Sequence, residues 1–132
     1  MVPLKFERVT KEEIAALITG KAREGRHLDY KRELPTSGND AKKEFLADVT
    51  SFANSGGGVI VFGVAEEKDA AGKNTGVPEE IVGLGGANLD AEQLRLERWL
   101  RTGVEPRLPA HRFHVSEIEP GKQVLVLVIK QS

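Results

Sequence analysis

Residues 45–64 read FLADVTSFANSGGGVIVFGV and place a helix, a glycine turn and a strand in direct succession. Apolar side chains recur at helical spacing from Phe45 to Phe52, which predicts an amphipathic helix. The pattern stops at residues 55–58, where glycines allow the backbone to turn sharply. Residues 59–64 are then continuously apolar, which predicts a strand buried on both faces near the centre of a sheet.

Similar patterns extend the prediction to both ends of the chain. A capping box at Thr10 and Glu13 opens a first helix. Residues 27–34 alternate as a half-buried strand, with Tyr30 on the apolar side. We expect an α/β (α+β) fold, with a mixed sheet of about five to six strands, about three helices and a C-terminal antiparallel hairpin. The further expected elements are a helix from residue 40, a polar mobile loop at 65–76, a short strand at 80–84, a helix from about residue 90, and strands at 110–119 and 122–130.

Length and composition bound the organisation of the protein. The 132 residues fit one domain, and because the apolar last strand has no polar tail after it, we expect residues 1–132 to be a domain excised from a longer protein. Cysteine is absent, which excludes disulfides and thiolate metal sites and suits a cytoplasmic location. No apolar run reaches the roughly 20 residues that a membrane span needs, so we expect no membrane partner.

Positive charge gathers in two stretches although the net charge is only −1. Residues 21–32 and 95–114 are rich in Lys, Arg and His, and such local patches can hold phosphates. Ordinary solvated faces explain the same residues equally well. The candidate nucleic-acid-binding residues are Lys21, Arg23, Arg26, Lys31, Arg32 and Arg112.

Acidic residues suggest a metal site. Asp29 and Lys31 are two apart on the predicted strand and project from its polar face, Glu24 lies shortly before them, and Glu66 follows the apolar strand 59–64. Carboxylates are the ligands that Mg²⁺ and Mn²⁺ prefer, and a neighbouring lysine suits phosphodiester chemistry. The spacing alone is weak, because an i, i+2 charge pair on a solvated strand and an acidic loop account for the same residues.

The glycine loop, residues 54–58, offers a second candidate site. The backbone N–H groups of Asn54, Gly56, Gly57 and Gly58 are of the kind that can cradle a phosphate. This loop runs from helix to strand, however, whereas a P-loop runs from strand to helix, and no G-K-[ST] follows. The order favours a helix end with tight packing over nucleotide binding.

Three segments taken together resemble the Schlafen/Alba-like (AlbA_2) domain family. They are EGRHLDYK at 24–31, FANSGGGVIVFGV at 52–64 and IVGL at 81–84, and the resemblance spans roughly residues 10–130. It implies an α/β fold and nucleic-acid binding, as in prokaryotic regulator-like proteins with a divergent ATPase-type region. In some animal Schlafens it implies metal-dependent cleavage of transfer or ribosomal RNA by three carboxylates.

The three carboxylates of that motif fall on Glu24, Asp29 and Glu66. Asp29 stands where the motif has glutamate, and Glu66 where it has aspartate, so both charges persist but each side chain changes by one methylene. Residue 65, often acidic in relatives, is alanine. Animal Schlafens fold two such modules around RNA, so a homodimer is one way for this single module to match them.

Four functions follow as hypotheses. The first is a nucleic-acid-binding domain, for RNA or DNA, of a larger transcriptional-regulator-like protein. The second is an endoribonuclease that uses Mg²⁺ or Mn²⁺ at Glu24, Asp29 and Glu66, with Lys31 assisting. The third and weaker is ATP or nucleotide binding at the glycine loop, and the fourth is a protein–protein assembly module.

Overall fold

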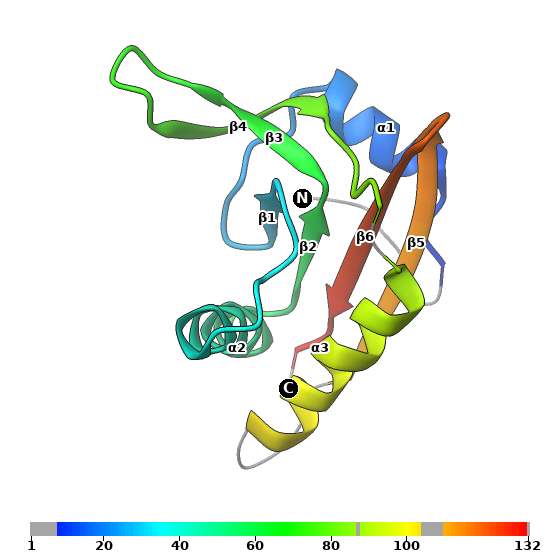
Figure 1. Ribbon diagram of the computed structural model, residues 1–132. Helices are drawn as coiled ribbons and strands as arrows, with labels where there is room; N and C mark the ends of the chain where they lie inside the picture. Colours follow the sequence, from blue (N-terminus) through cyan, green and yellow to red (C-terminus); the bar gives the residue numbers. More distant parts are fainter. Residues whose placement is uncertain (1–7, 87, 104–109, 132) are drawn as a thin grey trace.

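The computed structural model describes residues 8–86, 88–103 and 110–131 and shows an α+β fold, as expected (Figure 1). Its strands belong to two sheets rather than one: four form a mixed sheet and two a separate antiparallel ribbon. In chain order the elements are α1 (Lys11–Thr19), β1 (Leu28–Lys31), α2 (Asn39–Asn54), β2 (Gly58–Phe62), β3 (Val64–Lys68), β4 (Asn74–Ile81), α3 (Leu89–Gly103), β5 (His111–Glu119) and β6 (Lys122–Ile129).

The four-stranded sheet has the order β1-β2-β6-β5. β1 and β2 are parallel and α2 connects them, whereas β6 runs antiparallel to both of its neighbours. The apolar strands β2 and β6 occupy the centre, which confirms the predictions of a central strand and a C-terminal hairpin. β1 therefore forms one edge of the sheet, and its outer side is open to other groups.

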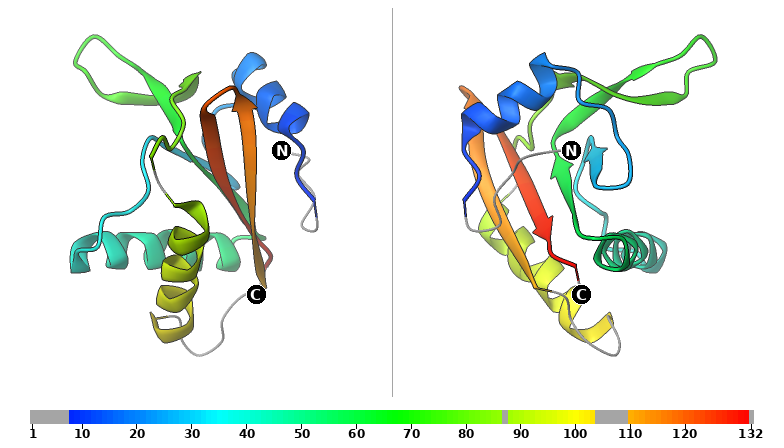
Figure 2. Two further views of the ribbon diagram at one scale, coloured as in Figure 1. Left: turned by 45° about the vertical axis from the view of Figure 1, so that its right-hand side comes forward. Right: turned by 180° about the vertical axis from the view of Figure 1, so that it is seen from behind.

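Both faces of the four-stranded sheet are covered by helices (Figure 2). Alternate residues of β2 serve the two faces: Ile60 and Phe62 join the core with α2 and α3, while Val59 and Val61 join the core that includes Ile14 of α1. Tyr30 is 2% exposed and lies in the α1 core, as its place in the alternating pattern predicts. The polar residues of β1 consequently lie on the α2 side.

The prediction of a mobile loop at 65–76 is wrong, because most of these residues form the β3–β4 hairpin. Asp69 builds the turn: its carboxylate accepts hydrogen bonds from the N–H groups of Ala71 and Lys73 at 2.8 and 2.9 Å. Of the expected strand at 80–84, only residues 80 and 81 are strand, as the end of the longer β4, and residues 82–84 lie in the connection that follows. A two-stranded ribbon beyond the main core needs few apolar side chains, so its polar composition resembled that of a loop (Figure 1).

The ends of the helices follow local signals in the sequence. Thr10 and Glu13 form the predicted capping box at α1, and α3 begins at Leu89, one residue from its predicted start. The predicted connection at 103–109, with Arg107, falls almost wholly outside the described residues. Across the part of the chain that the structure describes, no helix combines the length and apolar character needed to cross a bilayer.

Candidate metal centre

The carboxylates of Glu24, Asp29 and Glu66, called here the carboxylate cluster, converge beside the open edge of β1. Each offers an oxygen atom, and these three atoms lie within 4.8 Å of one another. Glu24 precedes β1, Asp29 lies within it, and Glu66 comes from β3 of the hairpin. They line a polar cleft of about 370 Å³ between the sheet edge and the hairpin.

The free edge of β1 holds Glu24 in place. The N–H of Tyr30 donates to Glu24 Oε2 at 2.8 Å, which satisfies a backbone group that has no strand partner on that side. The Tyr30 hydroxyl in turn donates to the carbonyl of Ala22 at 2.6 Å and so anchors the segment that leads to Glu24. The buried tyrosine and the cluster are thus parts of one local arrangement.

Gly76 of β4 connects two members of the cluster. Its N–H donates to Glu66 Oε1 at 2.8 Å, and its carbonyl accepts from the N–H of Glu24 at 2.7 Å. Gly76 has a φ of +85°, which glycine adopts without strain. Sequence reasoning missed this residue because it was assigned to a polar loop, where a glycine indicates only a turn.

Burial and the neighbouring acids raise the pKa of Glu24. Burial and a hydrogen bond with Asp29 raise the pKa of Glu24 to about 8, although the Tyr30 N–H opposes the shift, and the charges of Asp29 and Glu66 add to it. Without a cation, the cluster therefore keeps a proton at neutral pH. Bound cations reverse such a shift, because metal ligation favours the ionised carboxylate.

The donor set fits a hard divalent cation. All three groups are carboxylates, and Mg²⁺ and Mn²⁺ take oxygen ligands. Two oxygens on one Mg²⁺ lie at most about 4.2 Å apart, twice the metal–oxygen distance of about 2.1 Å. The carboxylate oxygens, which lie up to 4.8 Å apart, would therefore have to move closer together to share one ion.

Lys31 lies next to the cluster on the polar face of β1, the face the alternating pattern assigns it. Its Nζ is 3.2 Å from Asp29 Oδ2 and 3.3 Å from Asp48 Oδ2 of α2. Burial opposes its charge, but Asp29 and Asp48 outweigh burial and raise the pKa of Lys31 to about 12. Asp48 thus lies at the border where α2 meets β1.

The candidate phosphate-binding residues occupy different settings. Arg23, Arg26 and Arg32 are exposed, and Lys21 pairs with Glu67 at 2.8 Å. Arg32 lines the same cleft as the cluster, whereas Arg23 and Arg26 line a separate pocket. Arg112 is exposed on β5, three strands away from β1, so it does not share a surface strip with the others. Arg95 binds its own chain, donating to the carbonyl of Pro35 at 2.6 Å.

The glycine loop is occupied by close packing. A Cβ on Gly57 would lie 2.7 Å from the Ile129 carbonyl oxygen, and one on Gly58 would lie 2.6 Å from the Phe52 ring. The Gly57 N–H donates to the Phe52 carbonyl at 2.7 Å, and the Gly57 carbonyl lies 2.8 Å from a ring nitrogen of His27. These contacts are those of a helix end packed on strands, the role that the order of elements favoured.

Comparison with known proteins agrees with this fold and motif order. The sequence profile of the family described as Schlafen, AlbA_2 matches residues 24–132. This chain belongs to that family. A similar fold is found in the solution NMR structure of the N-terminal domain of a RecG-related protein from Nitrosomonas europaea. The TM-score is 0.63 and the sequence identity 18%, and the match covers 95% of this chain and 75% of that chain. Among curated proteins, none matches the sequence significantly.

Proposed function

We propose that this AlbA_2 domain binds nucleic acid and cleaves RNA with Mg²⁺ or Mn²⁺ held by the carboxylate cluster. The convergence of Glu24, Asp29 and Glu66 within 4.8 Å carries the proposal. The three residues come from separate segments of the chain, and the family resemblance assigns the same three positions a nuclease role. The structural neighbour adds support for nucleic acid, since it is the N-terminal domain of a putative ATP-dependent DNA helicase RecG-related protein.

Each group near the cluster has a defined part in this proposal. Glu24, Asp29 and Glu66 would hold a divalent cation, which would supply an activated water and neutralise charge on the phosphate. Lys31, protonated at neutral pH and 3.2 Å from Asp29, presents a fixed positive charge beside the scissile phosphate. The exposed Arg26 and Arg32 bind flanking phosphates, which makes binding salt-dependent and largely independent of sequence.

Binding without cleavage is the second candidate. The Asp29 and Glu66 exchanges alter the reach of two ligands, and exposed arginines serve binding whether or not a cation is held. In this case the domain acts in the cytoplasm as the nucleic-acid-binding part of a transcriptional-regulator-like protein. A homodimer stays a prediction, which light scattering tests.

The deciding experiment combines cleavage and retardation of labelled transfer RNA. In Mn²⁺, the parent should cut the RNA, and Glu24→Ala/Asp29→Ala should not, while both retard it on gels at low salt. Glu80→Ala, which removes an exposed carboxylate of the same hairpin, should cut like the parent. RNA that is retarded but intact with every variant supports binding without cleavage. RNA that is neither retarded nor cut contradicts both candidates.

A further inference from the structure

A second cavity lies on the other side of Lys31 from the carboxylate cluster, between β1, α2 and the connection at 32–38. Its volume is about 260 Å³, and its lining includes Phe45, Ile60 and Phe62 as an apolar floor. Its polar wall holds Lys31, Glu33, Glu44 and Asp48, and Asp48 and Glu44 lie 3.3 and 3.8 Å from Lys31 Nζ. Pockets for drug-sized ligands measure about 300–1,000 Å³, so this cavity suits a single planar ring system.

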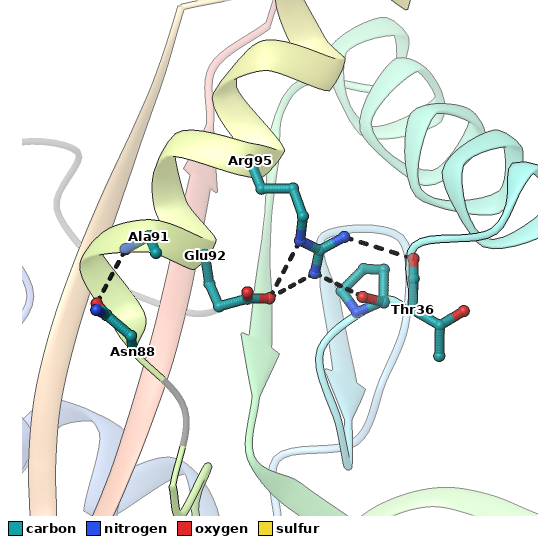
Figure 3. A network of polar contacts seen from close by, with 6 residues as sticks. Thr36, Asn88, Ala91, Glu92 and Arg95 are labelled. Atoms are coloured by element: carbon teal, nitrogen blue, oxygen red, sulfur yellow. Dashed lines mark hydrogen bonds and ion pairs between the residues drawn. The ribbon is translucent and has the colours of Figure 1, made fainter.

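The rim of this β1–α2 cavity is fixed from α3 (Figure 3). Arg95 donates to the carbonyls of Pro35 and Thr36, at 2.6 and 3.4 Å, and both residues line the cavity. Glu92 binds the same guanidinium at 2.5 Å, which lies 4.8 Å from the centre of the Trp99 ring. A connection held at these points gives the cavity a preformed shape, which lowers the cost of binding a ligand.

Lys31 joins the cavity to the cluster. Its Nζ lies 3.2 Å from Asp29 in the cluster and 3.3 Å from Asp48 in the cavity wall. Lys31 lines both the cluster cleft and the cavity, so a nucleotide with its phosphate at the first would turn its base toward the second. Single-stranded RNA is read in this way, with unstacked bases placed in pockets and their edges hydrogen-bonded.

We propose that the β1–α2 cavity binds one unstacked guanine base of the RNA whose phosphate lies at the carboxylate cluster, an inference that rests on the proposed function. Guanine presents two adjacent donors, N1–H and the 2-amino group, and a carboxylate such as Asp48 accepts both. The ammonium of Lys31 donates to the neighbouring O6. Adenine offers this wall one amino donor and no N1–H, and uracil offers one N–H between two acceptors.

Mononucleotides test the cavity apart from catalysis. With metal removed by EDTA, GMP, IMP, AMP and UMP are titrated into the isotope-labelled domain, and NMR shifts report both affinity and location. All four share the ribose phosphate, so differences report the base. We expect GMP to bind about tenfold or more tightly than AMP and UMP, within the range of one bidentate base contact, with IMP between them because it lacks the 2-amino group. The shifts should fall on α2 and residues 32–38.

Substitutions on α2 supply the matched controls. Asp48→Asn should remove the preference for GMP, since the amide accepts at only one position, while Asp40→Asn, an exposed acid of the same helix, should keep it. Equal binding of all four nucleotides, or an unchanged preference in Asp48→Asn, overturns the inference. If GMP is preferred but transfer RNA stays intact, the cavity stands and the proposed cleavage falls. If RNA is cut but no base is preferred, the proposed cleavage stands and the guanine site falls.

Discussion

The glycine loop and the carboxylate cluster are the two most conspicuous polar features of this sequence, and the structure uses them in opposite ways. In the loop, the Gly57 N–H donates to the Phe52 carbonyl, and a side chain at Gly57 would clash with the Ile129 carbonyl. In the cluster, the carboxyl groups of Glu24, Asp29 and Glu66 lie close together. Burial and these acidic neighbours raise the pKa of Glu24.

The difference teaches how to separate packing from chemistry. A feature whose polar groups are satisfied by its own chain serves the fold, and its loss should lower stability. A cluster that gathers like charges opposes folding, so neutralising one of its charges should spare stability and remove a ligand.

Replacement of Gly57 by alanine should lower the free energy of unfolding by about 3 kcal/mol, from the strain of a φ near +94° and the clash with the Ile129 carbonyl. Urea denaturation measures the change. Gly85→Ala is the matched control, because a Cβ there meets nothing within 4 Å, and it should stay within about 0.5 kcal/mol of the parent. Equal stability of the two variants would contradict the packing role.

Replacement of Glu66 by glutamine should weaken Mn²⁺ binding about 100-fold, since an amide keeps the Gly76 hydrogen bond but loses the ligand charge. Its unfolding free energy should change by no more than about 0.5 kcal/mol. Titration calorimetry gives the affinity, with the exposed Glu80→Gln as control. If Glu80→Gln weakens Mn²⁺ binding as much as Glu66→Gln, the metal lies elsewhere.

Two glycines of the β3–β4 hairpin allow strain to be separated from positioning. Gly76→Ala and Gly72→Ala both place a Cβ at a φ above +80°, so each should destabilise by about 1 kcal/mol. Gly76 also bonds Glu66 and Glu24, whereas Gly72 lies at the far turn. Only Gly76→Ala should weaken Mn²⁺ binding, by about tenfold. Identical metal affinities would show that Gly76 has no positioning role.

The raised pKa of Glu24 predicts a pH dependence in EDTA. The folded state holds this proton up to a pKa of about 8, above the ordinary glutamate value of 4.5, so the unfolded state binds fewer protons between these values. The stability that this proton gives the folded state is fully present below pH 4.5 and is lost as the pH rises through 8. The Tm of the parent should therefore fall with pH more than that of Glu24→Gln, by a few degrees at pH 9. A Tm that rises with pH in the parent relative to Glu24→Gln would contradict the shift.

Much of the main sheet could be predicted because its signals are local. The periodicity of residues 45–64, the capping box at Thr10 and the alternation around Tyr30 each fix an element within a few residues. The β3–β4 hairpin escaped prediction because its strands bury few side chains, so that the hydrophobic pattern on which strand prediction depends is missing.

The site was predictable only in part for a related reason. Period-two alternation placed Asp29 and Lys31 together, and residue type suggested Glu24 and Glu66 as partners. No local pattern shows that these two approach Asp29, and the family resemblance gave the grouping its main support. Gly76, Asp48 and Arg95 act through contacts distant in sequence, such as the bond from Arg95 to Pro35. Tertiary partners of this kind leave no periodic signal in a single sequence.

A crystal of the domain soaked in Mn²⁺ tests the central claim most directly, by anomalous scattering at the manganese edge. The account predicts one strong peak among the oxygens of Glu24, Asp29 and Glu66, which should vanish in Glu66→Gln crystals treated alike. A domain that cuts transfer RNA in Mn²⁺ but shows no peak between these carboxylates, or a peak that persists in the variant, would contradict it.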